Sequence, residues 1–246
     1  MQEIIKIENL KRDFVVGDEV VHALRGVSFT VEQGEFITIM GTSGSGKSTL
    51  LNLLGCLDTP TSGEYYLDGN SVREMSRNQR AALRNLKIGF VFQSYNLLPK
   101  TTSIENVELP LMYNSKVSHK ERTAKAIAAL EAVGLQHRMY HKSNQLSGGQ
   151  QQRVAIARAL VNDPVIILAD EATGNLDTRT SYEILTLFQH LHSIGRTIIF
   201  VTHNPEIAEF SSRNIVLRDG RIIEDTRNTN IASAKSILDT LPVEDN

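Results

Sequence analysis

The chain lacks several features that would assign it to a particular class of protein. Its 246 residues contain one cysteine, Cys56, so an internal disulfide and a cysteine-built metal site are both excluded. No run of about 18 apolar residues occurs, and a membrane-spanning helix is therefore not expected. The segment Met1–Lys6 has neither the basic region nor the apolar core of a secretory signal, so we expect a cytosolic protein.

The chain also lacks an excess of charge of either sign. Lysine and arginine number 26 and aspartate and glutamate 28, so the net charge is −2 and does not favour a nucleic acid or an anionic membrane surface as partner. The hydrophobic fraction of 41% and the charged fraction of 22% are those of a soluble globular protein. The length suits one large domain, or one domain with a small insertion.

The most informative stretch is a glycine-rich loop between two apolar runs, 36–40 and 49–54. This pattern predicts a strand, a tight phosphate-binding loop and a helix, whereas a serine- and glycine-rich turn that binds nothing would not need those flanks. Glycines let backbone N–H groups approach phosphate oxygens, and the helix N-terminus favours an anion. Lys47 supplies a charge toward the β- and γ-phosphates, and the Ser48 hydroxyl is placed to bind magnesium. The loop comprises Gly41, Thr42, Ser43, Gly44, Ser45, Gly46, Lys47, Ser48 and Thr49.

Three further apolar runs are predicted to be strands that end in polar or ionisable residues. Asp170 follows one of them and is the usual second anchor for magnesium beside a phosphate-binding loop. Strand alternation places Glu171 on the opposite side, where it can act as a general base on water. His203 either contacts the γ-phosphate or is structural. Gln93 is a site candidate by its position, although a loop glutamine is more often only solvated.

A second glycine-rich segment, Leu146–Gln150, precedes a helical pattern. Ser147 is a natural N-cap, and the open N–H groups of the next turn form an anion-binding helix start. Two glycines in a helix cost about 1 kcal/mol each relative to alanine, which suggests that another group approaches the backbone of Gly148 and Gly149.

The remaining chain predicts a small antiparallel sheet and a helical insertion. Alternating segments within residues 4–35 and 64–69 are strand signals, and Phe14 among them either stacks on a nucleobase or caps the sheet. The residue pattern over 94–139 is typical of helices. The helix predicted over 119–134 has one apolar side made of Ala124, Ile127, Ala128 and Ala132. Its exposed face is a candidate partner surface.

In order, the phosphate-binding loop, Gln93, Leu146–Gln150, Asp170–Glu171 and His203 resemble the nucleotide-binding domain of ATP-binding cassette (ABC) transporters, over about residues 4–224. The pentapeptide Leu-Ser-Gly-Gly-Gln is the specific element, because other phosphate-loop ATPases lack it. The resemblance implies an α/β fold: a P-loop NTPase core with a parallel-rich sheet, an N-terminal antiparallel β subdomain and an inserted α-helical subdomain at about 94–160. We expect the ATPase domain to occupy residues 1–225, and residues 226–246 to form a polar link and a C-terminal helix.

The resemblance also implies roles for single residues. Phe14 stacks on adenine, Lys47 and the loop backbone hold the phosphates, and Ser48, Gln93 and Asp170 serve the Mg²⁺ ion that accompanies ATP. Glu171 polarises the attacking water, His203 senses the γ-phosphate, and Asn175–Asp177 communicates between sites. Ser147, Gly148, Gly149 and Gln150 cap the ATP held by a second copy, which implies a head-to-tail homodimer. Ala172 stands where proline is usual, and retained catalysis is expected.

Segments 55–63, 92–99 and 169–177 are similar to the branch of MacB-type macrolide exporters and LolD-type lipoprotein-release ATPases. That similarity implies an ATPase at the cytoplasmic face of the inner membrane, powering a separate MacB/FtsX-like permease and, through it, periplasmic or outer-membrane components. The cargo would be macrolides or other antimicrobial compounds, or lipoproteins. Two alternatives stay open: a soluble ABC ATPase of DNA repair or translation, which would usually carry a coiled coil, a zinc hook or two fused cassettes, and a regulatory ATPase without transport.

Overall fold

Two sheets form the framework of the protein, whose computed structural model describes residues 2–114 and 116–242. The antiparallel sheet has the order β2-β1-β4-β5. Its strands are β1 (Glu3–Val16), β2 (Glu19–Glu32), β4 (Ser62–Leu67) and β5 (Asn70–Ser71). This arrangement confirms the predicted N-terminal antiparallel sheet, and it places Phe14 within β1.

The second sheet has six strands in the order β10-β9-β3-β8-β7-β6. The strands are β3 (Phe36–Met40), β6 (Ile88–Phe92), β7 (Ile166–Asp170), β8 (Ile198–Thr202), β9 (Arg213–Arg218) and β10 (Arg221–Arg227). All neighbours are parallel except β9 and β10. Strands far apart in sequence therefore lie side by side, as the predicted parallel-rich core requires.

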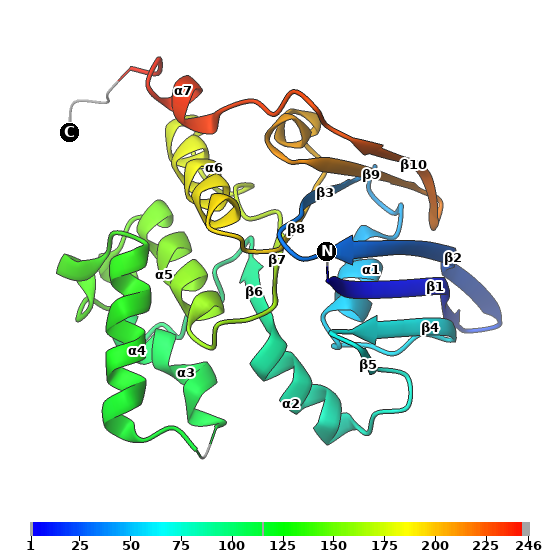
Figure 1. The fold of residues 1–246 in the computed structure, drawn as a ribbon, viewed down its shortest axis with the longest axis horizontal. Coiled ribbons are helices and arrows are strands. Elements are labelled where there is room, and N and C mark those ends of the chain that lie inside the picture. The colour runs from blue at the N-terminus through cyan, green and yellow to red at the C-terminus, as the bar shows by residue number, and fades with distance from the viewer. Residues whose placement is uncertain (1, 115, 243–246) are drawn as a thin grey trace.

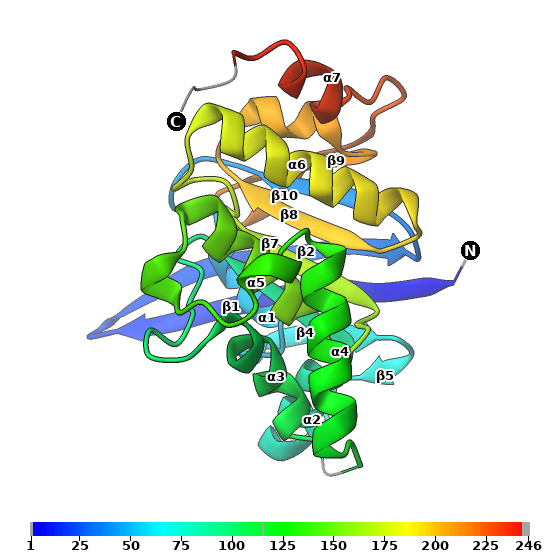
Figure 2. The same ribbon diagram turned by 90° about the vertical axis from the view of Figure 1, so that its left-hand side faces the viewer.

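Helices cover the six-stranded sheet and extend from one end of it (Figures 1 and 2). They are α1 (Lys47–Leu54), α2 (Arg77–Lys87), α3 (Ser103–Met112), α4 (His119–Ala132), α5 (Gly148–Leu160), α6 (Thr178–Ser193) and α7 (Ala234–Leu238). Helices α3, α4 and α5 lie together on the side opposite the antiparallel sheet (Figure 1). They correspond to the predicted helical subdomain. Among the described residues, no helix is long and apolar enough to cross a membrane.

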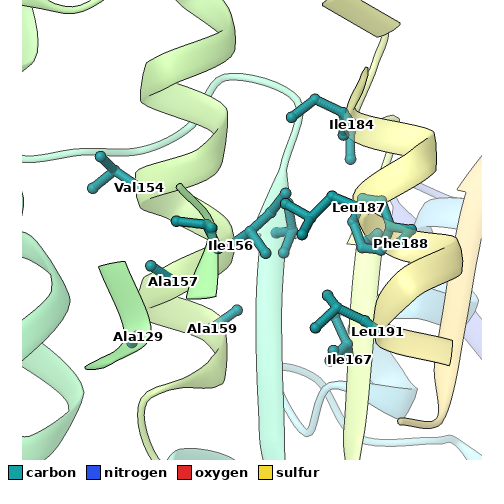
Figure 3. Close-up of a cluster of buried hydrophobic side chains, with 14 of the residues drawn as sticks. Ala129, Val154, Ile156, Ala157, Ala159, Ile167, Ile184, Leu187, Phe188 and Leu191 are labelled. Carbon is teal, nitrogen blue, oxygen red and sulfur yellow. The ribbon is translucent and has the colours of Figure 1, made fainter. Parts of the chain in front are cut away.

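Strand alternation divides the apolar residues into two cores. Ile37 and Leu168 face α1 and the antiparallel sheet, in one cluster. Ile167 and Phe200 face α5 and α6, in the other. Figure 3 shows this second core, where side chains from α5 and α6 converge on the strands between them. Phe188 and Phe200 pack edge to face there, with ring centroids 5.3 Å apart.

The prediction of which side of α4 packs against the protein is wrong. Ala126, Ala129 and Leu130 are buried, whereas Ala124, Ala128 and Ala132 are exposed. Alanines occur on both sides of this helix, so their spacing does not distinguish the faces, and Leu130 marks the side that packs against α3 and α5. Ile127 is partly buried at the edge of the core.

The C-terminal segment packs against its own domain. Strand β10 extends to Arg227, two residues into the expected polar link, and the helix that follows, α7, has five residues. Figure 2 shows α7 beside α6. Gln189 of α6 fastens the segment, because its side-chain amide donates to the carbonyl oxygen of Ala232 (2.7 Å) and accepts from the N–H of Ala234 (2.9 Å). The expected residues 243–246 lie outside the described part of the chain.

Candidate active site

The carboxyl ends of β3, β8 and β7 meet at one edge of the sheet and open into a cavity of about 1420 Å³. Register brings the ends together, because Met40 pairs with Thr202 and Val201 pairs with Asp170. The residue after each strand therefore reaches the same cavity. The predicted site residues that line it are Gly41, Thr42, Ser43, Gly44, Gly46, Lys47, Ser48, Thr49, Asp170, Glu171 and His203.

Two positions of the glycine loop have no room for a side chain, because they lie against the backbone of other segments. Gly46 has φ of 103°, and a Cβ on it would lie 2.7 Å from the carbonyl oxygen of Ala23. A Cβ on Gly41 would overlap the carbonyl oxygen of Leu217. Helix α1 then begins at Lys47 with no side-chain cap, so its first N–H groups remain available to an anion.

The side chain of Lys47 is buried under the loop. Its ammonium group donates to the carbonyl oxygens of Gly41 (2.7 Å) and Thr42 (2.9 Å). The lysine thereby closes the loop on itself and holds a positive charge at the cavity wall. Phosphate oxygens are the ligands that such a cradle of N–H groups and one cation suits best.

Asp170 and Glu171 lie on the same side, and the predicted alternation between them is wrong. Strand β7 ends at Asp170, and the backbone of Glu171 is left-handed, with φ of 44°. The alternation of side chains along a strand therefore does not extend to Glu171. Burial, and then repulsion from Glu171, raise the pKa of Asp170, while Lys47 opposes the shift. Two carboxylates and one ammonium group therefore share one wall of the cavity.

Glu171 and His203 form a hydrogen-bonded pair. The Nδ1 atom of the histidine lies 2.7 Å from Oε1 of the carboxylate. The glutamate side chain is 24% exposed and the histidine side chain 65% exposed. A carboxylate held by a neighbour at the mouth of a phosphate-binding cavity has the geometry of a general base with its orienting group.

Gln93 does not line the cavity but is joined to the turn that follows Glu171. Its side-chain amide donates to Oδ1 of Asn175 (3.1 Å), and the Asn175 amide donates to the Gln93 carbonyl (3.1 Å). A Cβ on Gly174 would lie 2.7 Å from Gln93 Nε2, so the turn and the glutamine pack closely. Its role at the metal stays a prediction.

Phe14 is not brought to the cavity wall. It is 37% exposed, and the guanidinium of Arg12 covers its ring at 4.5 Å. Its cross-strand partner Val21 lines the cavity instead, together with Val20 and His22. Sequence reasoning missed these three residues, although the hairpin pairing of two alternating strands would have placed them opposite residues 13–15. The stacking role of Phe14 stays a prediction.

The segment Ser147–Gln150 begins α5 outside this cavity. The Ser147 hydroxyl accepts from the Gln150 N–H (3.3 Å) and the Gln150 side chain accepts from the Ser147 N–H (3.1 Å), which confirms the predicted cap. Its glycines have a reason within the chain. A Cβ on Gly149 would overlap Cγ2 of Thr180, and one on Gly148 would lie 3.0 Å from the Tyr95 hydroxyl.

The oxygen donors of the cavity fit a magnesium ion that arrives with phosphates. Ser48 and Asp170 both line it, and Mg²⁺ prefers one or two protein oxygens completed by phosphate and water. Burial and a like-charged neighbour disfavour the Asp170 carboxylate, and a cation would relieve both effects. Within residues 2–114 and 116–242, no group of three or more acidic, histidine or cysteine side chains could hold a metal alone.

Known proteins are similar to this chain in sequence and in fold. Residues 24–174 match the family model described as ABC transporter. The chain is 55% identical over 222 residues to an uncharacterized ABC transporter ATP-binding protein of Thermotoga maritima, across 90% of this chain and 94% of that protein. It is 50% identical over 233 residues to the macrolide export ATP-binding/permease protein MacB of Hyphomonas neptunium, across 95% of this chain and 36% of MacB. The dimeric post-hydrolysis structure of the ATP-binding cassette MJ0796 bound to ADP and Pi is 45% identical, with a TM-score of 0.83 over 91% of this chain and 98% of that one.

Proposed function

The chain belongs to the ABC transporter family, and we propose that it is the ATP-hydrolysing subunit that drives a separate, MacB/FtsX-like membrane permease. As a member of this family it binds ATP and is an ATPase. The observation that carries the hydrolytic part of the proposal is the Glu171–His203 pair, 2.7 Å apart at the cavity that holds Lys47 and the glycine loop. A regulatory module without hydrolysis would not need this pair.

Hydrolysis follows from the order of groups along the cavity. The glycine loop and Lys47 hold the β- and γ-phosphates of ATP, and the Glu171 carboxylate accepts a proton from the water that attacks the γ-phosphorus. His203 orients the carboxylate and contacts the γ-phosphate. When bound, Mg²⁺ neutralises charge on the phosphate oxygens, and Ser48, Gln93 and Asp170 would hold it.

A second copy of the chain completes each site. Ser147, Gly148, Gly149 and Gln150 lie outside the cavity of their own copy, so the helix start of α5 is free to cap the ATP of a partner in a head-to-tail dimer. The cassette structures at 45% and 46% identity are dimeric, which supports a homodimer of this chain. One copy alone would bind ATP and turn it over slowly.

The permease and the macrolide cargo are proposed from the similarity to MacB, and the lipoprotein alternative from the sequence resemblance to the LolD type. The match spans 36% of the Hyphomonas MacB, whose name joins an ATP-binding part to a permease. We assign this chain to the cytoplasmic face of the inner membrane, attached through its permease and serving periplasmic or outer-membrane components beyond it. The cargo would be a macrolide or other antimicrobial compound, or a lipoprotein.

Glu171→Gln tests the catalytic assignment. The amide cannot accept the proton, so turnover should fall by about 10²–10⁴-fold, the usual contribution of a general base, while ATP binding is kept. Light scattering with MgATP should then show a stable dimer. Glu131→Gln, an exposed change on α4, is the control and should behave as the parent. Parent-like hydrolysis by Glu171→Gln would refute the base, and a monomer with MgATP would refute the dimer.

Co-purification tests the transport role separately. Tagged chain carrying Glu171→Gln should bring down an integral-membrane protein from detergent-solubilised membranes in the presence of ATP. Recovery of DNA-repair proteins or ribosomes in place of a membrane protein would favour the soluble alternative. Identification of the permease by mass spectrometry would also narrow the cargo.

A further inference from the structure

The turn that carries the proposed base is tightly built. Glu171 opens it with a left-handed backbone, and the N–H of Gly174 donates to the Glu171 carbonyl at 2.8 Å. The N–H of Glu171 donates in turn to the carbonyl of Val201 on β8 (2.9 Å). Such a turn leaves the carbonyl of its second residue unpaired within the turn. Here that residue is Ala172, which is 2% exposed, so its carbonyl needs a buried donor.

Gln152 supplies that donor from α5. Its side-chain amide is fully buried, and Nε2 donates to the Ala172 carbonyl oxygen at 2.7 Å. The other half of the amide, Oε1, is buried with no hydrogen-bond partner among the described residues. A methionine would fill the same space without an unpaired polar atom. The unpaired Oε1 destabilises the fold, whereas Nε2 stabilises the turn that begins at Glu171 through its hydrogen bond to Ala172.

We infer that Gln152 is a positioning residue for the general base, and that it links the nucleotide-capping end of α5 to the catalytic turn of its own copy. The link rests on the proposed dimer, in which Gly148 and Gly149 meet the partner's ATP. Gln152 lies four residues after Gly148, on the same side of one continuous helix. Movement of the helix start on the partner's nucleotide would therefore reach the peptide beside Glu171.

The same turn also reaches Gln93. Asn175 exchanges two hydrogen bonds with Gln93, and Gly174 packs against its side chain. Gln152 thus holds the turn that carries the base, Glu171, and that turn also contacts Gln93, the glutamine predicted to bind magnesium. Loosening this segment would misplace Glu171 without touching Lys47 or the glycine loop. Binding of ATP should consequently survive and the chemical step should suffer.

The test is Gln152→Met, with Gln189→Met as matched control. Gln189 donates to a backbone carbonyl at the same 2.7 Å, but it holds the C-terminal segment, and neither it nor its partner Ala232 lines the cavity that contains the base. Gln152→Met should lower kcat by about 10–100-fold, the cost of a misplacement near 1 Å, with the KM for ATP changed less than about twofold. Its melting temperature should stay close to the parent's, because the unpaired buried Oε1 is removed while the buried Ala172 carbonyl loses its donor, and the two effects oppose each other. Gln189→Met should keep the parent kcat.

The Hill coefficient for ATP reports the link between the two sites, and it should fall toward one in Gln152→Met. Adding Glu171→Gln to this variant should still give the MgATP dimer, so a failed dimer in Glu171→Gln alone is assigned to the proposed function and not to Gln152. If Gln152→Met unfolds, Gln152→Leu takes its place. A kcat within twofold of the parent, a kcat loss equalled by Gln189→Met, or a loss that follows the melting temperature would overturn the positioning role. An unchanged Hill coefficient would overturn the link.

Discussion

Gly149→Ala separates two reasons why a glycine stands at the second position of α5. One reason lies within the chain, because the added Cβ would overlap Cγ2 of Thr180 on α6. The other lies between chains, because this glycine is proposed to face the partner's ATP. Thr180→Ser removes only Cγ2. The double variant therefore relieves the first conflict and leaves the second in place.

The size of the effect follows from packing and helix propensity. Forcing a methyl group into an occupied space costs about 1–3 kcal/mol. Replacing glycine with alanine in a helix returns up to about 1 kcal/mol. Subtracting about 1 kcal/mol leaves a net loss of about 0–2 kcal/mol, which corresponds to a fall in melting temperature of up to about 8 °C for a chain of this length.

The assay is thermal unfolding of the parent, Gly149→Ala, Thr180→Ser and the double variant. In the double variant the Cβ would lie 3.8 Å from Cβ and 3.9 Å from Oγ1 of residue 180, which is ordinary contact, so the melting temperature should recover. The cap of α6 is kept, because the N–H of residue 180 still donates to Asp177 Oδ1. ATPase activity should stay low in the double variant. A melting temperature that does not recover would refute the packing argument, and recovered ATPase activity would refute the role between chains.

Three further outcomes follow from single contacts. Lys47→Ala should weaken ATP binding about 10–100-fold, measured by titration with a fluorescent nucleotide, because one charge-assisted contact to phosphate is lost; unchanged affinity would contradict the cradle. Burial raises the pKa of the Cys56 thiol to about 11, so at pH 8 about one thiol in a thousand is ionised, and iodoacetamide should label the folded chain far more slowly than the chain in urea. Arg158→Met should lower the free energy of unfolding in urea by about 1.5–3 kcal/mol, because its guanidinium donates to the carbonyls of Tyr95 and Asn96 (2.8 and 2.7 Å); parent-like stability would show that these bonds are dispensable.

Local chemistry made much of the site predictable. A glycine loop between a strand and a helix, a serine cap before α5 and a carboxylate after an apolar strand each depend on neighbours within a few residues. The sequence therefore placed Lys47, Ser147 and Asp170 on the correct elements. The parallel register of β3, β8 and β7 then brought three distant strand ends to one cavity, as expected for a parallel-rich sheet.

Features set by packing were harder to predict. The buried side of α4 depends on what α3 and α5 present to it, and alanines on both sides give no preference. Glu171 turned to the side of Asp170 because its backbone is left-handed, which no local pattern announces for a glutamate. The contact of Gly149 with Thr180 joins residues from two helices, and only the assembled fold brings them together.

The lysine beneath the glycine loop has a consequence for the speed of recognition. Because its ammonium group already bridges the carbonyls of Gly41 and Thr42, the loop has its binding conformation before the triphosphate enters. On binding, the Lys47 ammonium group exchanges backbone carbonyl oxygens for phosphate oxygens, and the main chain needs little rearrangement. Encounter should consequently be governed by diffusion and charge, and the association rate should drop as salt is added.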